Sequence, residues 1–374
     1  MNRDPHEAWN EAEAINHRAR FEQIIYGDIP VIPNVRCLAR ETLPTGQLGE
    51  TAIAERWKFE IETGSDPLAG ALLLVLPRAR SVQAMMVCQA FQRPPSPLAR
   101  VERVIANGEK SRRVRASDAA LELILGEHIH VPPLAHILRA GFGLCLFCPG
   151  ELVPDNRRTA PAILDRLAKD GQRSGALAWW AAITSAVRRL LAGDQRLCDT
   201  PMVAWGHSRH GKAALLAGAF DPDFAAVISH QSGRFGAALT HGGSGEGVLQ
   251  IARAYPHWFK GGFAESAQSL PHDLDQHLLL GLIAPRPVLL GNADADFWAD
   301  PRGTFKAAQA AHASFARLKA PGFLQATLGD PNCEGGLVAF SRKGGHGIRS
   351  VDWAHFLQFM RVKFGGVEYP VHTD

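Results

Sequence analysis

Short apolar runs alternate along the chain with longer stretches whose apolar residues recur at helical spacing. Short apolar runs bounded by glycine, proline or polar residues are typical of buried strands. They occupy residues 57–61, 71–76, 82–88, 143–147, 202–205, 225–229 and 287–290, with a last candidate at 323–328. Because helical stretches lie between them, the pattern predicts an α/β fold, a three-layer α/β/α sandwich around a mainly parallel sheet.

The clearest helical stretch is residues 176–191, where Trp179 and Trp180 fall on the apolar face and are expected in the core. The first fifty residues show no strong strand pattern, so we expect them to wrap the outside as a helix and an extended arm. We find no repeat and no low-complexity linker. The sequence therefore predicts one domain, residues 1–374.

One serine lies where a strand turns into a helix. The apolar run at 202–205 is followed by Gly206, Ser208 and Gly211, and then by the alanine-rich helical stretch 213–220. Such a turn holds a serine hydroxyl above the strand ends and points backbone N–H groups at a developing oxyanion. The usual elbow has its second small residue two places after the serine, a place that His210 takes here. An ordinary strand-to-helix turn is therefore the alternative.

The composition argues against several classes of protein. The chain has 374 residues, of which 46% are hydrophobic and 21% charged, which suffices for a large core. Its 40 basic and 37 acidic residues are mixed, so we expect neither nucleic acid nor a membrane surface as partner. The basic run at 110–115 is expected to be a solvated loop. Residues 1–26 are polar where a signal peptide would be apolar, so we expect a cytoplasmic protein.

The cysteines and two histidines near the serine suggest no cofactor or metal. Cys145 and Cys148 form a C-x-x-C, but they lie in an apolar run without a second pair, and we expect both to be buried. His207 and His210 flank Ser208 without an adjacent carboxylate or third histidine. No metal and no cofactor are therefore predicted, and the oligomeric state is left open.

A nucleophilic serine needs a histidine base and an acid that orients the histidine. In doubly wound hydrolases the chain order is serine, acid, histidine. An acidic loop with Asp294, Asp296 and Asp300 follows the run at 287–290, and His346 lies among glycines before an amphipathic closing helix at 351–360. His346 is therefore the candidate base. Asp300 is expected to cap the next helix.

The stretch 206–212, Gly-His-Ser-Arg-His-Gly-Lys, resembles the Gly-x-Ser-Arg-x-Gly-Lys elbow of the glucuronoyl esterases, carbohydrate esterase family 15. Other stretches resemble bacterial members in the same order, at residues 224–233, 255–259, 275–277, 282–287 and 296–301. The resemblance spans roughly residues 141–360. It implies an α/β-hydrolase fold and metal-free ester cleavage.

The resemblance also implies roles for individual residues. Ser208 would be the nucleophile, His346 the base, and Arg209 an oxyanion-hole residue through its backbone N–H and its guanidinium. The resemblance further implies that substrate is contacted by the side chains of Lys212, Trp298, Glu246 and Trp258.

Two departures from the family pattern bear on this assignment. Many members carry a glutamate where this chain has Gln231, and an amide has no charge to stabilise an imidazolium. We therefore expect the acid after the next strand, at Asp296, which matches the family's Asp-x-Trp-x-Asp-Pro spacing, with Asp294 as the alternative. Residues 232–236 place bulk and charge where the family has small residues.

The sequence thus predicts a serine carboxylic-ester hydrolase acting on a polar, sugar-linked ester. The oxyanion would bind the Arg209 N–H and an N–H from the loop at 89–97. One alternative is a sugar deacetylase or general carboxylesterase with the same triad. Another is a catalytically dead binding protein that keeps the fold, of which Gln231 would be the first sign.

Overall fold

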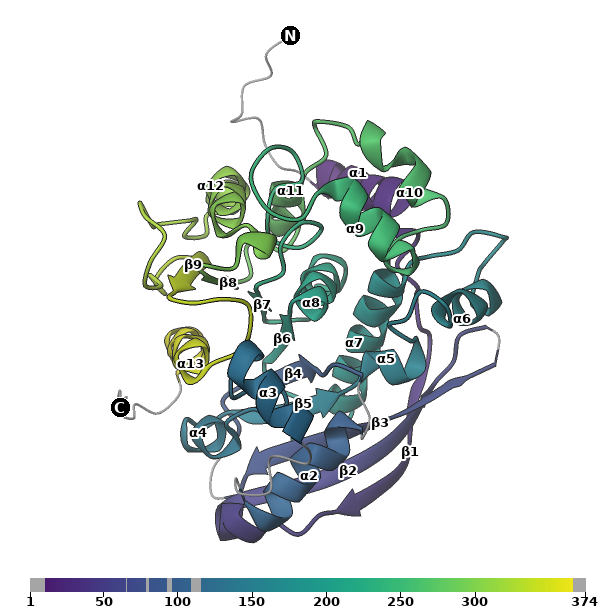
Figure 1. Cartoon of the computed structure of the whole chain (residues 1–374). Coiled ribbons are helices and arrows are strands. Elements are labelled where there is room, and N and C mark those ends of the chain that lie inside the picture. Colours follow the sequence, from purple (N-terminus) through teal and green to yellow (C-terminus); the bar gives the residue numbers. More distant parts are fainter. Residues whose placement is uncertain (1–10, 65, 79–80, 93–95, 109–115, 366–374) are drawn as a thin grey trace.

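In the part of the chain that the structure describes, nine strands form one sheet in the order β1-β2-β3-β5-β4-β6-β7-β8-β9 (Figure 1). The computed structural model describes residues 11–64, 66–78, 81–92, 96–108 and 116–365. The strands are β1 (Val35–Thr42), β2 (Ala52–Ile61), β3 (Leu68–Pro77), β4 (Met85–Gln89), β5 (Gly143–Phe147), β6 (Met202–His207), β7 (Ala226–His230), β8 (Val288–Ala293) and β9 (Leu337–Arg342). Strands β1, β2 and β3 pair antiparallel, and β3 pairs antiparallel with β5. The rest of the sheet is parallel, which confirms the predicted fold class.

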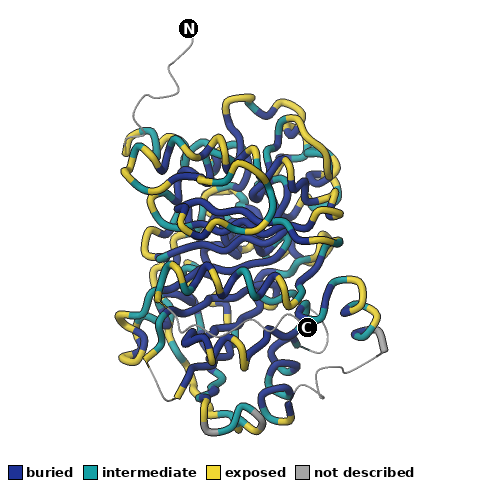
Figure 2. Tube along the Cα trace, turned by 90° about the vertical axis from the view of Figure 1, so that its left-hand side faces the viewer, coloured by how far each residue is buried: buried dark blue, intermediate teal, exposed yellow. Residues whose placement is uncertain are grey.

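Helices cover both faces of the sheet (Figure 1). They are α1 (Glu11–Phe21), α2 (Pro97–Asn107), α3 (Ala116–Leu125), α4 (Leu134–Arg139), α5 (Pro149–Leu152), α6 (Ala160–Arg166), α7 (Ala176–Ala192), α8 (Arg209–Phe220), α9 (Val248–Ala254), α10 (Phe263–Ser266), α11 (Gln276–Gly281), α12 (Pro301–Arg317) and α13 (Ser350–Phe364). Apolar side chains of α1, α7, α8, α11 and α12 build one core, and those of α2, α4 and α13 build the other. Figure 2 shows the buried strands between these two layers.

Strand β6 shows why the apolar runs are continuous. Met202 and Ala204 face the core under α7 and α8, whereas Val203 and Trp205 face the core under α13. Alternate side chains of a strand point to opposite faces, so a strand covered on both faces needs apolar residues at every position. Trp205 stacks on Trp353 of α13 with ring centroids 5.5 Å apart.

The N-terminal segment differs in part from the prediction. Helix α1 is present as expected, and Phe21 at its end is fully buried in the core. The arm after it is not merely extended, however, because Val35–Thr42 pairs with β2 as the edge strand β1. This strand is mostly exposed and carries charged residues, so it lacks the apolar run by which the other strands are recognised.

The predicted last strand at 323–328 is wrong, and the last strand is β9, Leu337–Arg342. Phe323 makes only an isolated bridge to Leu337. Further along, the side chain of Gln325 covers the free edge of β9. Its Nε2 donates to the Ala339 carbonyl at 2.7 Å, and its Oε1 accepts from the Ala339 N–H at 2.8 Å. The segment therefore lies beside the sheet through a side-chain amide rather than a backbone ladder.

Other expectations are met or fall outside the described part. Cys145 and Cys148 are buried and free, as predicted, and Trp179 and Trp180 lie in the core. The basic run at 110–115 lies outside the described residues. Within the described ranges, no helix combines the length and the apolar character needed to cross a membrane.

Candidate active site

The parallel half of the sheet brings four loops to one edge. Strands β6, β7, β8 and β9 are neighbours and run in the same direction. Their carboxyl ends are followed by Ser208, Gln231, Asp296 and His346 in turn. Ligands of open α/β sheets bind at this edge.

Ser208 lies on a strained turn between β6 and α8. Its φ is 56° and its ψ is −124°, a conformation that non-glycine residues rarely adopt. Its N–H donates to the His230 carbonyl at 2.8 Å, which ties the turn to β7. Gly206 allows the turn, because a Cβ there would lie 2.0 Å from the His210 carbonyl oxygen. The strand, turn and helix predicted around Ser208 are therefore present, with the serine at the helix N-terminus.

His346 and Asp296 are paired. The His346 Nδ1 lies 2.7 Å from the Asp296 Oδ2, and the carboxylate side chain is 1% exposed while the imidazole is 34% exposed. An ionised carboxylate can only accept, so Nδ1 carries the proton and Nε2 keeps a free lone pair. That is the tautomer that a general base requires.

The residue before the serine packs against this pair. The ring of His207, the residue before Ser208, packs with its centroid 4.7 Å from that of His346. In the described part of the chain, no hydrogen bond joins Ser208 Oγ to His346. Such bonds are often long in unliganded enzymes and tighten when substrate binds.

The two other aspartates of the acidic loop bind backbone. Asp294 Oδ1 accepts from the Gly344 N–H at 2.8 Å, and so it contacts the loop that carries the histidine rather than the imidazole. Asp300 caps α12 by accepting from the Gly303 N–H at 2.9 Å, as predicted. Of the three aspartates, Asp296 alone is bonded to His346.

We call residues 343–347 the histidine loop. Gln231 brackets His346 within it, because its Oε1 accepts from the Gly347 N–H at 2.7 Å and its Nε2 donates to the Gly345 carbonyl at 3.5 Å. The amide therefore holds the backbone on both sides of the histidine. A carboxylate could make the first bond but not the second, because it has no donor.

Arg342 connects the histidine loop to Asp352 of α13. Its guanidinium donates to the Gly345 carbonyl at 3.2 Å and to the Gly347 carbonyl at 2.9 Å, and its Nε lies 2.9 Å from both oxygens of Asp352. Burial would raise the pKa of Asp352, but His230 and Arg342 outweigh it and lower that pKa. The loop thus rests on a buried ion pair between β9 and α13.

Arg209 follows the serine and is held by Asp155. One guanidinium nitrogen bonds to an Asp155 oxygen, whose partner oxygen accepts from His257 Nε2 at 3.1 Å and from the Trp258 indole N–H at 2.9 Å. Burial alone would raise the pKa of Asp155, yet the His257 hydrogen bond and the Arg209 charge hold it well below its usual range. Arg209 also lies 5.0 Å from the Trp258 ring centroid.

The residues expected to contact substrate differ in exposure. Trp298 is 64% exposed on a short turn after Asp296, and its carbonyl accepts from the Glu246 N–H at 3.3 Å. Lys212 and Trp258 are buried. The Lys212 ammonium donates to the carbonyls of Ser232 and Arg234, both at 2.5 Å. Burial lowers the pKa of Lys212 to about 7, although the nearby Glu246 opposes that shift.

Two further expectations concern the surroundings of the elbow. The guanidinium of Arg234 contacts the backbone of a loop, donating to the Gly242 carbonyl at 2.9 Å. The two histidines that flank the serine have different neighbours. His207 Nδ1 lies 3.0 Å from His230 Nδ1, whereas the His210 ring packs against Phe91.

Sequence reasoning missed the supporting residues of this site. They are Asp155, His257, Arg342 and Asp352. Asp155 lies 54 residues from Arg209 and 102 from His257, whereas Arg342 lies only 10 residues from Asp352, but no motif spacing connects any of these pairs. Gln89 entered the prediction only through the backbone of the loop at 89–97. It is 2% exposed at the end of β4, and its amide atoms have no hydrogen-bond partner among the described residues. The signal in the sequence was a polar residue directly after the apolar run at 82–88.

Comparison with known proteins gives consistent similarities. Residues 166–319 match the family model described as the glucuronyl esterase of fungi. A carbohydrate esterase from an unknown prokaryotic organism is 28% identical over 366 residues, covering 94% of this chain and 84% of the relative. A 4-O-methyl-glucuronoyl methylesterase of Schizophyllum commune is 33% identical over 171 residues, covering 40% of this chain and 42% of the relative.

The fold is similar to that of solved glucuronoyl esterases over nearly the whole chain. A solved glucuronoyl esterase from Solibacter usitatus has a TM-score of 0.77 and 28% identity, covering 96% of this chain and 93% of that chain. The sequence motifs and the order of the sheet agree with this similarity. The chain has an α/β-hydrolase fold and is similar over nearly its whole length to the glucuronoyl esterases of carbohydrate esterase family 15.

Proposed function

We propose that this protein is a serine carboxylic-ester hydrolase that cleaves sugar-linked esters of a uronic acid. The observation that carries the proposal is the 2.7 Å contact between His346 Nδ1 and Asp296 Oδ2, beside a serine held at a φ of 56°. A paired histidine and carboxylate next to a strained serine at a helix N-terminus are the parts that acyl transfer requires.

The reaction follows from these parts. His346 Nε2 takes the proton of Ser208, and the serine oxygen attacks the ester carbonyl carbon. The Arg209 N–H, from the residue after the nucleophile, donates to the resulting oxyanion. Asp296 stabilises the imidazolium, which then protonates the leaving alcohol. Water, deprotonated by His346, cleaves the acyl-enzyme and releases the acid.

The substrate class rests on the relatives and on the polar groups around the elbow. The fungal relative is named for methyl esters of 4-O-methyl-glucuronate. In this chain the half-buried Glu246 and the exposed Trp298 lie together through a backbone hydrogen bond, which suits a sugar that needs both hydroxyl contacts and an apolar face. These features support a uronate ester over a simple acetate.

The test is hydrolysis of methyl and benzyl glucuronate beside p-nitrophenyl acetate, with wild type and Ser208→Ala in parallel. We expect wild type to cleave the glucuronate esters, and we expect kcat to fall at least about 10⁴-fold in the variant. Serine-dependent cleavage of acetate alone would instead favour a deacetylase or general esterase. No serine-dependent turnover of any of these esters would overturn the proposal in favour of a binding protein.

A further inference from the structure

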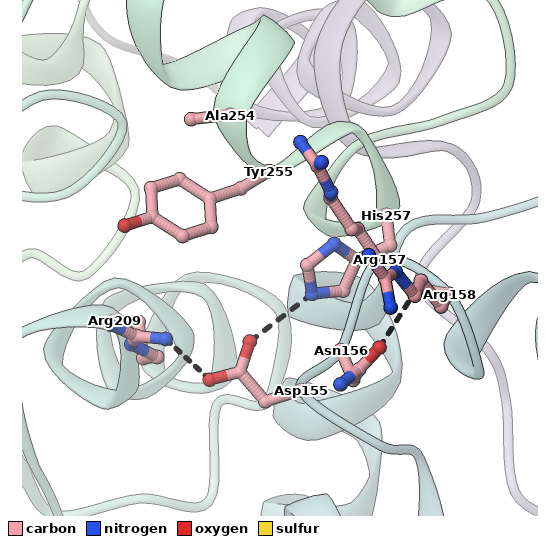
Figure 3. A pocket seen from close by; sticks show the side chains of 8 residues that line it. All are labelled: Asp155, Asn156, Arg157, Arg158, Arg209, Ala254, Tyr255 and His257. Atoms are coloured by element: carbon pink, nitrogen blue, oxygen red, sulfur yellow. Dashed lines mark hydrogen bonds and ion pairs between the residues drawn. The ribbon is translucent and has the colours of Figure 1, made fainter.

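A pocket of about 370 Å³ opens beside Arg209. Its walls come from the turn after α5 (Asp155, Arg157 and Arg158), from the start of α8 (Arg209), and from the end of α9 with the turn that follows (Tyr255 and His257). Figure 3 shows Asp155 between Arg209 and His257, with the arginines of the turn nearby. A pocket of this volume accommodates a small ligand such as a sugar unit.

The pocket carries unbalanced positive charge. Its one lining carboxylate, Asp155, is already bonded to Arg209, His257 and Trp258. Arg157 and Arg158 are exposed, and neither forms an ion pair with any residue that the structure describes. Two guanidinium groups are therefore available to an anion entering from solvent.

Two parts of the pocket wall are ordered before any ligand binds. Asn156 Oδ1 accepts from the Arg158 N–H at 2.8 Å and from the Thr159 N–H at 3.3 Å, which sets the turn that carries both arginines. Tyr255 lies flat on Trp258, with ring centroids 3.9 Å apart and an angle of 6° between the rings. An ordered turn and a stacked aromatic ring reduce the ordering cost of binding.

We propose that this pocket binds the free carboxylate of an acidic sugar unit that neighbours the esterified one. The proposal rests on the proposed function, because Arg209 belongs both to the pocket wall and to the elbow that would cleave the ester. A guanidinium presents paired N–H donors that match the two oxygens of a carboxylate. The esterified uronate has lost that charge, so the pocket would select substrates with a second, unesterified uronate.

The direct test needs no turnover. Ser208→Ala is titrated calorimetrically with diglucuronate, with neutral xylobiose and with inorganic phosphate. We expect diglucuronate to bind more tightly than either of the others, and we expect Arg157→Gln with Arg158→Gln to weaken it about 10-fold, or about 1.4 kcal/mol. The binding should also weaken with added salt, because both arginines are exposed.

The matched control removes two other exposed cations, by Arg139→Gln with Lys319→Gln, which lie outside the pocket. Diglucuronate affinity should stay within about twofold in this control, since unpaired surface charges act weakly at a distance. The proposal fails if wild-type-like affinity survives in the pocket variant or if the control loses as much. It also fails if diglucuronate does not bind, or if phosphate binds as tightly, which would mark a general anion site.

A kinetic test separates this proposal from the proposed function. The pocket variant should raise KM about 10-fold for the monomethyl ester of diglucuronate, with kcat and the KM for methyl glucuronate unchanged. An equal rise for both esters would overturn the pocket assignment and leave the esterase proposal intact. If wild type cleaves neither ester, the proposed function fails, and the titration still decides whether the pocket binds a uronate.

Discussion

Asp294 and Asp296 are two residues apart and contact different atoms of the histidine loop. Asp296 bonds to the His346 imidazole, and Asp294 bonds to the Gly344 N–H. The family spacing in the sequence favoured Asp296 over Asp294 as the acid, and this choice stays a prediction. The amide at Gln231 could not be interpreted from the sequence, because its two bonds go to backbone atoms of a distant loop.

The two aspartates should therefore differ sharply when changed to asparagine. Asp296→Asn keeps the shape but removes the charge that stabilises the imidazolium, so we expect kcat to fall by about 10⁴-fold. Asp294→Asn can still accept from the Gly344 N–H, so we expect a loss below about 10-fold. Steady-state kinetics on methyl glucuronate measures both, and the reverse order would make Asp294 the acid.

Lys212 predicts a pH-dependent stability. Burial lowers its pKa in the folded protein to about 7 from 10.5, so between these values the unfolded chain binds more protons at this site. Below pH 7 both states are charged and the full cost of burying the ammonium is present. As pH rises towards 10.5 that cost disappears, so Lys212 becomes less destabilising.

The measurement is urea unfolding of wild type and Lys212→Met at several pH values between 7 and 10. The free energy of unfolding of wild type, minus that of the variant, should increase with pH across this range. Since the methionine does not titrate, the difference isolates the lysine. A difference that stays constant or decreases would contradict the assigned burial of the charge.

At the scale of the elements, the buried parallel strands were predictable and the edge strands were not. Both faces of β6 and β8 are covered, so each strand begins with a continuous apolar run, Met202–Trp205 in β6 and Val288–Leu290 in β8. Strand β1 is an exposed edge without such a run, and the segment at 323–328 has strand-like composition but lies beside β9 through Gln325. The residue composition of a segment indicates whether it is buried. Whether an edge segment pairs with its neighbouring strand depends on tertiary contacts, which its composition does not show.

The connection from β9 to α13 is the element that positions His346. Arg342→Lys keeps the positive charge but loses the fork that reaches Asp352 and the carbonyls of Gly345 and Gly347. We expect kcat to fall at least about 10-fold with KM little changed, because the loop that orients the base is loosened.

The same pair should matter for stability. Arg342→Met leaves the buried Asp352 without its guanidinium, which typically costs about 3–5 kcal/mol of unfolding free energy. Arg20→Gln breaks an ion pair whose aspartate, Asp273, is 76% exposed, and it should cost less than about 1 kcal/mol. Urea unfolding of both variants measures the contrast, and equal losses would show that Arg342 is not an anchor.

On the scale of the whole molecule, the strand order is what assembles the site. Four consecutive parallel strands, β6 to β9, deliver Ser208, Gln231, Asp296 and His346 to one edge from positions spread over 139 residues of sequence. Chain order predicted Ser208, His346 and an acidic loop between them, because doubly wound hydrolases keep the order serine, acid, histidine. The choice of Asp296 within that loop came from the family spacing. The supports at Asp155, Arg342 and Asp352 depend on packing between elements and could not be predicted in this way.

Covalent labelling shows whether Ser208 is a nucleophile that His346 activates. A fluorophosphonate forms a phosphorus–oxygen bond to an activated serine with loss of fluoride, and peptide mass spectrometry locates the adduct. Nucleophilic catalysis by Ser208 predicts one adduct, on Ser208, absent in Ser208→Ala and formed at least about 10³-fold more slowly in His346→Ala. A protein that hydrolyses glucuronate esters without labelling at Ser208, or that labels equally fast without His346, would contradict it.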